Sequence, residues 1–300
     1  MKLFGEAWAP THATLIFAVP ERFENPMKMG SIGVGFNFAA GVQTKIELRG
    51  RSSDDLVYWN GNLIDGKVSI TAADIFRERQ NSDDSYLISH SSQIPIGCGL
   101  STSGAGALGV VYALDDLYDS NIGISSLNDM AHQADVTNNT GLGSVVGQTS
   151  GGIEIRLTQG SPSTAKTKII HNSADIVILI KGPLSTPDVL VSESMMKKVT
   201  QTGLKLTQNL NSVKGNWVTE FIKIGHQFML KCGLATTRII SAVEDLKSIG
   251  EGNVTMSMIG ESLIVNPISP IRLEKWANDN QWIIVKTKIT NELPKIVINP

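Results

Sequence analysis

A glycine-rich stretch at residues 95–109 constrains the fold of this chain more than any other feature. It holds five glycines and three consecutive hydroxyl side chains and runs directly into an apolar helical pattern. Each glycine costs conformational entropy on folding, so a turn that only joins a strand to a helix rarely carries this many. Glycines also let an anion approach backbone N–H groups, and a helix N-terminus attracts negative charge. The stretch therefore predicts a phosphate-binding loop followed by a helix that begins near Ser103.

This loop matches neither of the two commonest phosphate motifs. It lacks the Gly-Lys-Ser/Thr ending of the P-loop, and it lacks the glycine spacing with a later acidic residue that marks dinucleotide-binding folds. A tight turn that binds nothing is the alternative interpretation. The number of glycines favours a binding function.

The composition is that of a globular protein. The chain has 300 residues, of which 41% are hydrophobic and 18% are charged, which excludes disordered and fibrous classes. Its 26 basic and 28 acidic residues give a net charge of -2, and they form no basic block. These features argue against nucleic acid as a partner.

The two cysteines and the lengths of the apolar runs indicate the cellular compartment. Cys98 and Cys232 are far apart and form neither a metal-ligand spacing nor a disulfide framework, which fits a reducing compartment. No apolar run approaches the ~20 residues that span a bilayer, and the N-terminus lacks a signal-peptide pattern. We therefore expect a cytoplasmic protein with no membrane partner.

The order of the expected elements predicts an α+β fold. Short β-rich runs predict strands at residues 13–18, 32–38, 42–49, 56–59, 86–91, 151–157, 176–180, 254–258, 262–265 and 282–288. Apolar periodicity and capping residues predict helices at residues 71–79, 103–117, 125–136, 188–210, 215–232, 236–247 and 270–278. The elements lack regular strand–helix alternation, so we expect two lobes, residues 1–160 and residues 161–300.

Residues 95–105 resemble the second signature motif of the GHMP kinases, a family of small-molecule kinases. Other segments resemble one branch of that family, the archaeal pantoate kinases; these are residues 9–12, 25–26, 30–31, 33–35, 60–61, 131–135, 140–148, 151–152, 182–186 and 256–260. The resemblance implies transfer of the γ-phosphoryl group of ATP to the 4-hydroxyl of pantoate, giving 4-phosphopantoate for coenzyme A synthesis. It also implies an N-terminal lobe like ribosomal protein S5 domain 2, a ferredoxin-like C-terminal lobe and an active site between them.

The same resemblance assigns roles to individual residues. Ser103 is expected to contact the β- and γ-phosphates and Mg²⁺, and Asp135 stands where relatives carry a metal-binding Glu. The shorter side chain keeps the carboxylate but loses one methylene of reach. The expected ATP-binding residues are Pro95, Gly97, Gly99, Leu100, Ser101, Thr102, Ser103, Gly104 and Ala105. The expected substrate-binding residues are His12, Lys28, Ser31, Thr140 and Gly141.

Ser144 departs from the family pattern, because relatives usually have an Asp there that accepts the proton of the attacking hydroxyl. Serine cannot serve as that base alone, and general-base help is worth ~10²–10⁴-fold in rate. Three explanations stay open: a mechanism without a base, replacement of the Asp by another group such as Asp135, or a homologue that binds nucleotide and has lost catalysis.

Two further departures concern the acceptor. Ile32 stands where the branch tends to have Arg, although a carboxylate such as pantoate favours a bidentate Arg. Lys28 and Arg22 are nearby in sequence and could supply the charge. Glu261 stands where relatives tend to have Asn and is expected to add negative charge near the cleft. Another hydroxy acid or small alcohol is therefore the alternative acceptor, and a homodimer through the first lobe is possible.

Overall fold

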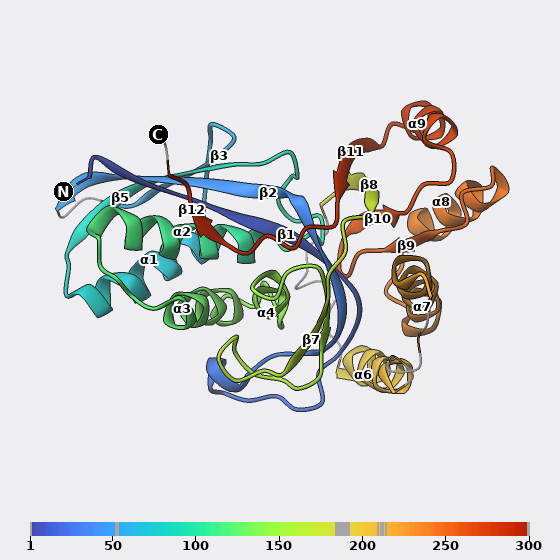
Figure 1. The fold of residues 1–300 in the computed structure, drawn as a ribbon, viewed down its shortest axis with the longest axis horizontal. Helices are drawn as coiled ribbons and strands as arrows, with labels where there is room; N and C mark the ends of the chain where they lie inside the picture. The colour runs from blue at the N-terminus through green and yellow to red at the C-terminus, as the bar shows by residue number, and fades with distance from the viewer. Residues whose placement is uncertain are drawn as a thin grey trace.

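Two long antiparallel strands, β1 (Phe4–Ala18) and β2 (Ile32–Arg51), contribute to the hydrophobic cores of both lobes. The computed structural model describes residues 2–51, 54–183, 193–208, 210, 213 and 215–298. The two strands are paired from Phe4 opposite Glu47 to Ala18 opposite Ile32. In Figure 1 they cross from the N-terminal lobe to the base of the C-terminal lobe. They therefore form the shared backbone of the molecule.

The first lobe is an eight-stranded sheet covered on one face by helices. Its main path is β12 (Lys295–Ile296), β1, β2, β5 (Asp84–Ser91), β3 (Leu56–Trp59) and β4 (Asn62–Ile64). Helices α1 (Lys67–Gln80), α2 (Thr102–Tyr118) and α3 (Ile124–Thr137) lie on the same side of this sheet (Figure 1). Small residues let α2 approach closely, since a Cβ at Gly109 would lie 2.0 Å from Thr44 Oγ1. This close packing fixes the start of α2 relative to the sheet.

A side branch of the first sheet carries short elements beside the cleft. Strand β6 (Ile153–Arg156) pairs with β2 and with β7 (Thr167–Ile170). The five-residue helix α4 (Ser144–Gln148) precedes β6, and the 3₁₀ helix η1 (Pro26–Lys28) precedes β2. These elements bring residues 140–156 beneath the loop that precedes α2.

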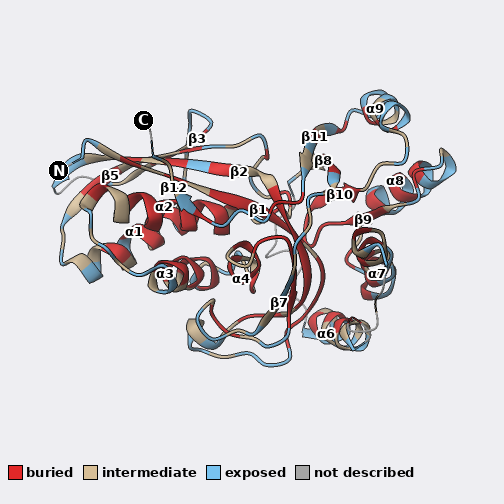
Figure 2. Ribbon diagram, in the orientation of Figure 1, coloured by how far each residue is buried: buried red, intermediate tan, exposed pale blue. Residues whose placement is uncertain are grey.

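The second lobe is a four-stranded antiparallel sheet in the order β11 (Ile283–Lys288), β8 (Asp175–Gly182), β10 (Glu261–Val265) and β9 (Val254–Met256). Its helices are α6 (Glu193–Thr207), α7 (Trp217–Cys232), α8 (Thr237–Ser248) and α9 (Pro270–Asp279). Figure 2 shows buried residues on the inner faces of these helices and exposed residues on their outer faces, as amphipathic helices require. No helix in these described ranges is both long and apolar enough to cross a membrane.

The predicted α+β class and the two-lobed arrangement are confirmed, and several boundaries differ. Two expected strands, residues 32–38 and 42–49, are one continuous strand β2. The small residues Ala39, Ala40 and Gly41 interrupt the apolar pattern, but pairing with β1 continues across them through an irregularity between Ala9 and Thr11. The strands β7 and β12 and the short helix α4 were not predicted, since elements of two to five residues carry little periodicity.

Candidate active site

The glycine loop forms a turn whose backbone leaves the start of α2 open. Gly97 and Gly99 have φ angles of +78° and +73°, which favour glycine. Ser101 is also left-handed, with φ of +54°, and its side chain makes no capping hydrogen bond to α2. The first N–H groups of this helix therefore have no side-chain cap, and they carry the positive end of the helix dipole. An anion can satisfy them.

The second lobe holds this loop in place. Ser257 Oγ donates to the carbonyl oxygen of Gly99 at 2.6 Å, and Ser262 Oγ donates to that of Cys98 at 2.7 Å. A Cβ at Gly99 would lie 2.6 Å from the carbonyl carbon of Ile259, so the two backbones are in direct contact. The loop is therefore fixed by both lobes.

Helix α4 is tied to the same loop by one buried side chain. Gln148 Nε2 donates to the carbonyl oxygen of Pro10 at 2.7 Å and to that of Ser101 at 3.0 Å. Gln148 is fully buried, so losing these bonds would be costly in an interior that offers its amide no water. The bonds couple the position of Ser144, at the start of α4, to the loop.

A cavity of about 180 Å³ lies between the loop, α4 and the second lobe. Its polar lining includes the hydroxyl groups of Ser31, Ser101, Thr102, Ser103, Thr140 and Ser144. Its apolar lining consists of Phe17, Ile96, Leu100, Leu142, Met258 and Ile259. None of the described residues that line it is acidic or basic.

Asp135, on α3, lies next to three of the hydroxyl groups that line this cavity. Its Oδ1 accepts hydrogen bonds from Ser103 Oγ at 2.9 Å and Thr140 Oγ1 at 2.6 Å, and its Oδ2 accepts one from Ser144 Oγ at 2.9 Å. The carboxylate is almost completely buried. A Cβ at Gly141 would lie 1.8 Å from Oδ2, so only glycine fits there. Because three hydroxyl protons point to Asp135, the oxygen lone pairs of these hydroxyls are available to the cavity.

A second cavity of about 240 Å³ adjoins the first and shares Ile96, Thr102, Ser103 and Thr140 with it. Its walls are mainly apolar and include Trp59, Ile64 and Val68. His90 contacts it from below, bonded through Nδ1 to Thr44 Oγ1 and through Nε2 to Ser69 Oγ, both at 2.9 Å. Burial lowers the pKa of His90 to about 4, so this ring is neutral at pH 7. The second cavity suits a flat, uncharged aromatic ring.

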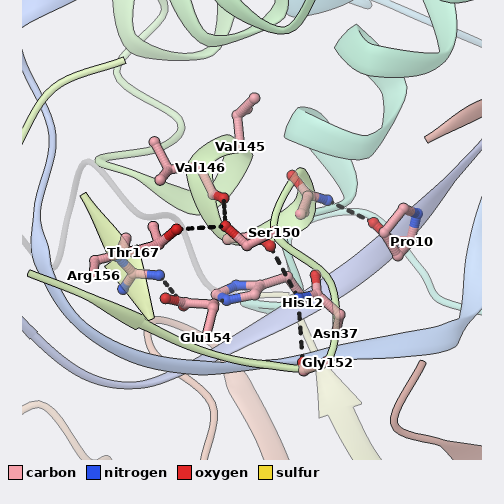
Figure 3. Close-up of polar contacts among 12 residues, drawn as sticks. Pro10, His12, Asn37, Val145, Val146, Ser150, Gly152, Glu154, Arg156 and Thr167 are labelled. Carbon is pink, nitrogen blue, oxygen red and sulfur yellow. Dashed lines mark hydrogen bonds and ion pairs between the residues drawn. The ribbon is translucent and has the colours of Figure 1, made fainter. Parts of the chain in front are cut away.

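A buried charged network lies under α4 (Figure 3). Glu154 Oε1 accepts from His12 Nε2 at 2.9 Å and forms an ion pair with Arg156 Nη1. Burial lowers the pKa of His12, despite its hydrogen bond to Glu154, so the imidazole is neutral and donates through Nε2. Two glycines leave room for the network, because a Cβ at Gly35 would lie 2.1 Å and a Cβ at Gly147 would lie 2.6 Å from His12 Nε2.

Arg156 lies near Gly143 and Ser31, and Ser31 lines the first cavity. A Cβ at Gly143 would lie 2.8 Å from Ser31 Oγ and 3.6 Å from Arg156 Cδ. Arg156 is 2% exposed, and its Nε and Nη2 have no hydrogen-bond partner among the described residues. Nε and Nη2 are the pair of donors that binds a carboxylate side-on.

The residues expected from the sequence divide into two groups. The loop residues Gly97, Gly99 and Leu100–Ser103 line the first cavity together with Ser31, Thr140, Gly141 and Ser144. Pro95, Gly104, Ala105, Asp135, His12 and Lys28 do not line it. Lys28 is exposed on η1, and His12 is fully buried against Glu154.

Two expectations about charge differ from the observed arrangement. Glu261 does not add negative charge to the cavity, because its carboxylate accepts from Thr236 Oγ1 at 2.9 Å and pairs with Arg238 at the start of α8. The sequence analysis missed Arg156, a buried cation near Gly143 and Ser31. The alternation Ile153–Glu154–Ile155–Arg156, with two charges on one face of a short strand, was the available signal. Residues 184–186 of the family resemblance lie outside the described residues.

The oxygen groups near Ser103 suit a hard cation. Among the residues described, no group of three or more His, Cys, Asp or Glu side chains could hold a metal ion. The Ser103 hydroxyl and the Asp135 carboxylate, 2.9 Å apart, fit Mg²⁺, which usually takes one or two protein oxygens and completes its shell with phosphate oxygens and water.

The fold, the uncapped loop and the adjoining cavities define a small-molecule kinase of the GHMP type. The family model described as the GHMP kinases N-terminal domain matches residues 66–152. The chain is 30% identical over 260 residues to the pantoate kinase of Methanocaldococcus jannaschii, covering 85% of this chain and 90% of that protein. It is 27% identical over 263 residues to the pantoate kinase of Thermococcus kodakarensis, covering 86% and 85% of the two chains. This chain belongs to the GHMP kinase family, in the group of the pantoate kinases.

Solved structures agree with this fold. A phosphotransferase related to the coenzyme A biosynthesis pathway superposes with a TM-score of 0.83 at 23% identity, covering 98% of both chains. The mevalonate diphosphate decarboxylase of Enterococcus faecalis superposes with a TM-score of 0.73 at 15% identity, covering 99% of both chains. At these identities the likeness establishes the fold.

Proposed function

We propose that this protein transfers the γ-phosphoryl group of ATP to the 4-hydroxyl of pantoate, giving 4-phosphopantoate. Relatives named pantoate kinase match most of the chain, the first at 30% identity over 85% of it. The observation that carries the proposal is the buried Arg156, whose Nε and Nη2 are unpaired and whose Cδ lies near Gly143, next to the cavity-lining Ser31. A small hydroxy acid supplies the carboxylate that these two donors lack.

ATP binds across both cavities in this proposal. The phosphates accept hydrogen bonds from the uncapped N–H groups at the start of α2, where Gly97 and Gly99 let them approach. The adenine ring occupies the apolar cavity beside Trp59. Ser103 and Asp135 would hold Mg²⁺, which neutralises negative charge on the phosphates when it is bound.

The acceptor binds in the cavity of about 180 Å³. Its carboxylate lies near Gly143, close to the Ser31 hydroxyl and the Arg156 side chain. Its 4-hydroxyl extends toward the loop and donates a hydrogen bond to Ser144 Oγ, whose own proton points to Asp135. Binding at both ends holds the hydroxyl near the γ-phosphate, which supplies the positioning that phosphoryl transfer mainly requires.

Ser144 fits a kinase that works without a carboxylate at this position. The described lining of the cavity contains no acidic side chain that could take the proton directly. Phosphoryl transfer passes through a loose transition state in most analyses, so early removal of the proton contributes less than positioning. We expect turnover that is slower than a general base would allow, by up to the ~10²–10⁴-fold that such a base contributes.

The test is acceptor-dependent ADP release with Mg²⁺-ATP and either pantoate or pantoamide, in which a neutral amide replaces the carboxylate. The wild-type protein is expected to prefer pantoate, and Arg156→Gln should reduce that preference by at least about 30-fold, since truncating one partner of a buried charge pair costs 2 kcal/mol or more. Arg156→Lys keeps the positive charge but lacks the paired N–H donors of the guanidinium group. It should therefore recover only part of the preference for pantoate over pantoamide.

Arg238→Gln is the matched control. Arg238 also forms an ion pair with a glutamate, Glu261, but neither residue lines the acceptor cavity, so its loss should leave the preference unchanged. ADP release with another hydroxy acid and none with pantoate would support the alternative acceptor. Tight ATP binding without turnover on any acceptor would support a nucleotide-binding homologue, one of the three explanations that Ser144 leaves open.

A further inference from the structure

Ser144 is a hydroxyl group of the protein itself inside the cavity proposed for phosphoryl transfer. It is the first residue of α4, and it lines the cavity of about 180 Å³ together with Thr102 and Ser103 at the start of α2. Its side chain is half-buried, so it is partly shielded from bulk water and open to a molecule in the cavity. Ser144 therefore borders the same space as the helix start that binds the phosphates of ATP in the proposed function.

The hydrogen bonds of Ser144 are those of an activated nucleophile. Its Oγ donates to Asp135 Oδ2 at 2.9 Å, whereas Ser103 Oγ and Thr140 Oγ1 both donate to Oδ1. Two hydroxyl groups thus orient the carboxylate through one oxygen, and Ser144 bonds the other. Enzymes that form covalent intermediates place a nucleophile within hydrogen-bond reach of a base that a third group orients. The proton of Ser144 therefore has a destination, and the Oγ lone pairs are free to attack.

Backbone packing and one buried amide hold this pair close to the glycine loop. A Cβ at Gly141 would lie 1.8 Å from Asp135 Oδ2 and 2.7 Å from Ser144 Oγ, so both groups are packed against the main chain there. Gln148, about one turn further along α4, donates to the carbonyl oxygen of Ser101 at 3.0 Å and ties the helix to the loop. Positioning of this kind is what phosphoryl transfer mainly requires of a protein.

We propose that Ser144 takes the γ-phosphoryl group of ATP when no acceptor occupies the cavity. This inference rests on the proposed function and adds a second reaction at the same site. A bond forms between Ser144 Oγ and the γ-phosphorus, the bond from that phosphorus to the oxygen bridging to the β-phosphate breaks, and ADP leaves. The Ser144 proton passes to Asp135 Oδ2 along their hydrogen bond.

Phosphorylation of Ser144 closes the cavity to the acceptor. The acceptor hydroxyl donates to Ser144 Oγ in the proposed function, so the two oxygens are neighbours that compete for one phosphorus atom. Phosphoserine carries a charge of about −1.5 to −2 at pH 7, and here it lies beside the Asp135 carboxylate, so it repels an acceptor that is itself a carboxylate. The reaction therefore inactivates each molecule once, and a bound acceptor prevents it.

The experiment incubates the whole purified chain with Mg²⁺-ATP and no acceptor and measures its intact mass over time. The mass should rise by one phosphoryl group per chain, and fragmentation of the peptide that contains residue 144 should locate that group on Ser144. Pantoate at about ten times its KM should slow this rise roughly tenfold, because it occupies the cavity. Ser144→Ala should show no rise, and Ser144→Thr, which keeps a hydroxyl group, should show a slower one.

Ser150→Ala is the matched control. Ser150 follows the end of α4, is not among the described residues that line the cavity, and donates to the carbonyl oxygen of Val146 at 2.7 Å (Figure 3). Its loss should leave the mass gain unchanged.

The outcomes separate this inference from the proposed function. No mass gain in a wild-type protein that turns over pantoate, or a gain located on another residue, overturns the inference and leaves the proposed function standing. A gain on Ser144 without turnover of pantoate supports the inference and contradicts the proposed acceptor. Absence of both the mass gain and the turnover overturns both.

Discussion

Replacing Ser144 by aspartate tests whether this position and Asp135 share one electrostatic site. Ser144 Oγ is 2.9 Å from Asp135 Oδ2, so Ser144→Asp brings a second carboxylate to about 4 Å from the first. Two unit charges at that distance repel by about 4 kcal/mol at an effective dielectric constant of 20, which suits the half-buried Ser144. At pH 7 and without divalent cations, we expect the free energy of unfolding of Ser144→Asp to be lower by about this amount than that of Ser144→Asn. Asparagine has the same shape as aspartate and carries no charge.

The pH dependence of this difference has a definite sign. Repulsion raises the folded-state pKa of one carboxyl above its unfolded value, so the penalty is present at pH 7 and fades as the pH falls and the pair takes up a proton. Urea denaturation of both variants at pH 7 and pH 4 in EDTA measures this difference in the free energy of unfolding. Added Mg²⁺ should reduce the difference. Equal stability of Ser144→Asp and Ser144→Asn at pH 7 in EDTA would refute the adjacency of the two groups.

Three further predictions concern the loop and the buried titratable groups. Gly99→Ala introduces a Cβ 2.6 Å from the carbonyl carbon of Ile259 at a φ of +73°. The free energy of unfolding, measured by thermal denaturation, should therefore fall by more than about 1 kcal/mol, and titration should show weaker ATP binding. An unchanged free energy of unfolding and unchanged ATP affinity would contradict the loop contact. Burial raises the pKa of Cys98 to about 11, so at pH 8 Ellman's reagent should label it only after unfolding, and rapid native labelling would be inconsistent with this environment. Burial lowers the pKa of His90 to about 4, whereas the unfolded ring titrates near 6.5, so the unfolded state takes up the proton first as the pH falls. Stability should drop by about 3 kcal/mol between pH 6.5 and pH 4 in urea denaturation, and His90→Gln should remove this contribution; an unchanged pH slope would argue against a buried neutral His90.

The elements with strong local signals were predicted well. The helix expected to begin near Ser103 begins at Thr102, and the strand Leu56–Trp59 has the expected bounds. A glycine turn followed by apolar residues at helical spacing identifies a helix start from neighbouring residues alone. The length of β2 could not be predicted in the same way, because its small residues continue the strand only through pairing with β1.

The candidate site was likewise predicted from the sequence only in its local part. The hydroxyls of Ser101, Thr102 and Ser103 were expected near the phosphate, and they line the acceptor cavity. The expected cation Lys28 is exposed, while the buried cation Arg156 comes from β6, more than a hundred residues further along the chain. Lys28 was expected because it is near Ser31 in the sequence, whereas strand pairing opposite Gly33 brings Arg156 close to Gly143 and Ser31.

The sequence by itself determined the phosphate loop, because the need for glycine at left-handed positions and the polarity of a helix N-terminus are properties of adjacent residues. It also determined the family and the α+β class. Only the tertiary structure decided which groups lie together at the candidate site: Arg156 near Ser31, the apolar residues of the cavity lining and the three hydroxyls that donate to Asp135. Those groups come from strands and turns far apart in sequence, and long-range pairing and burial alone determine which of them meet.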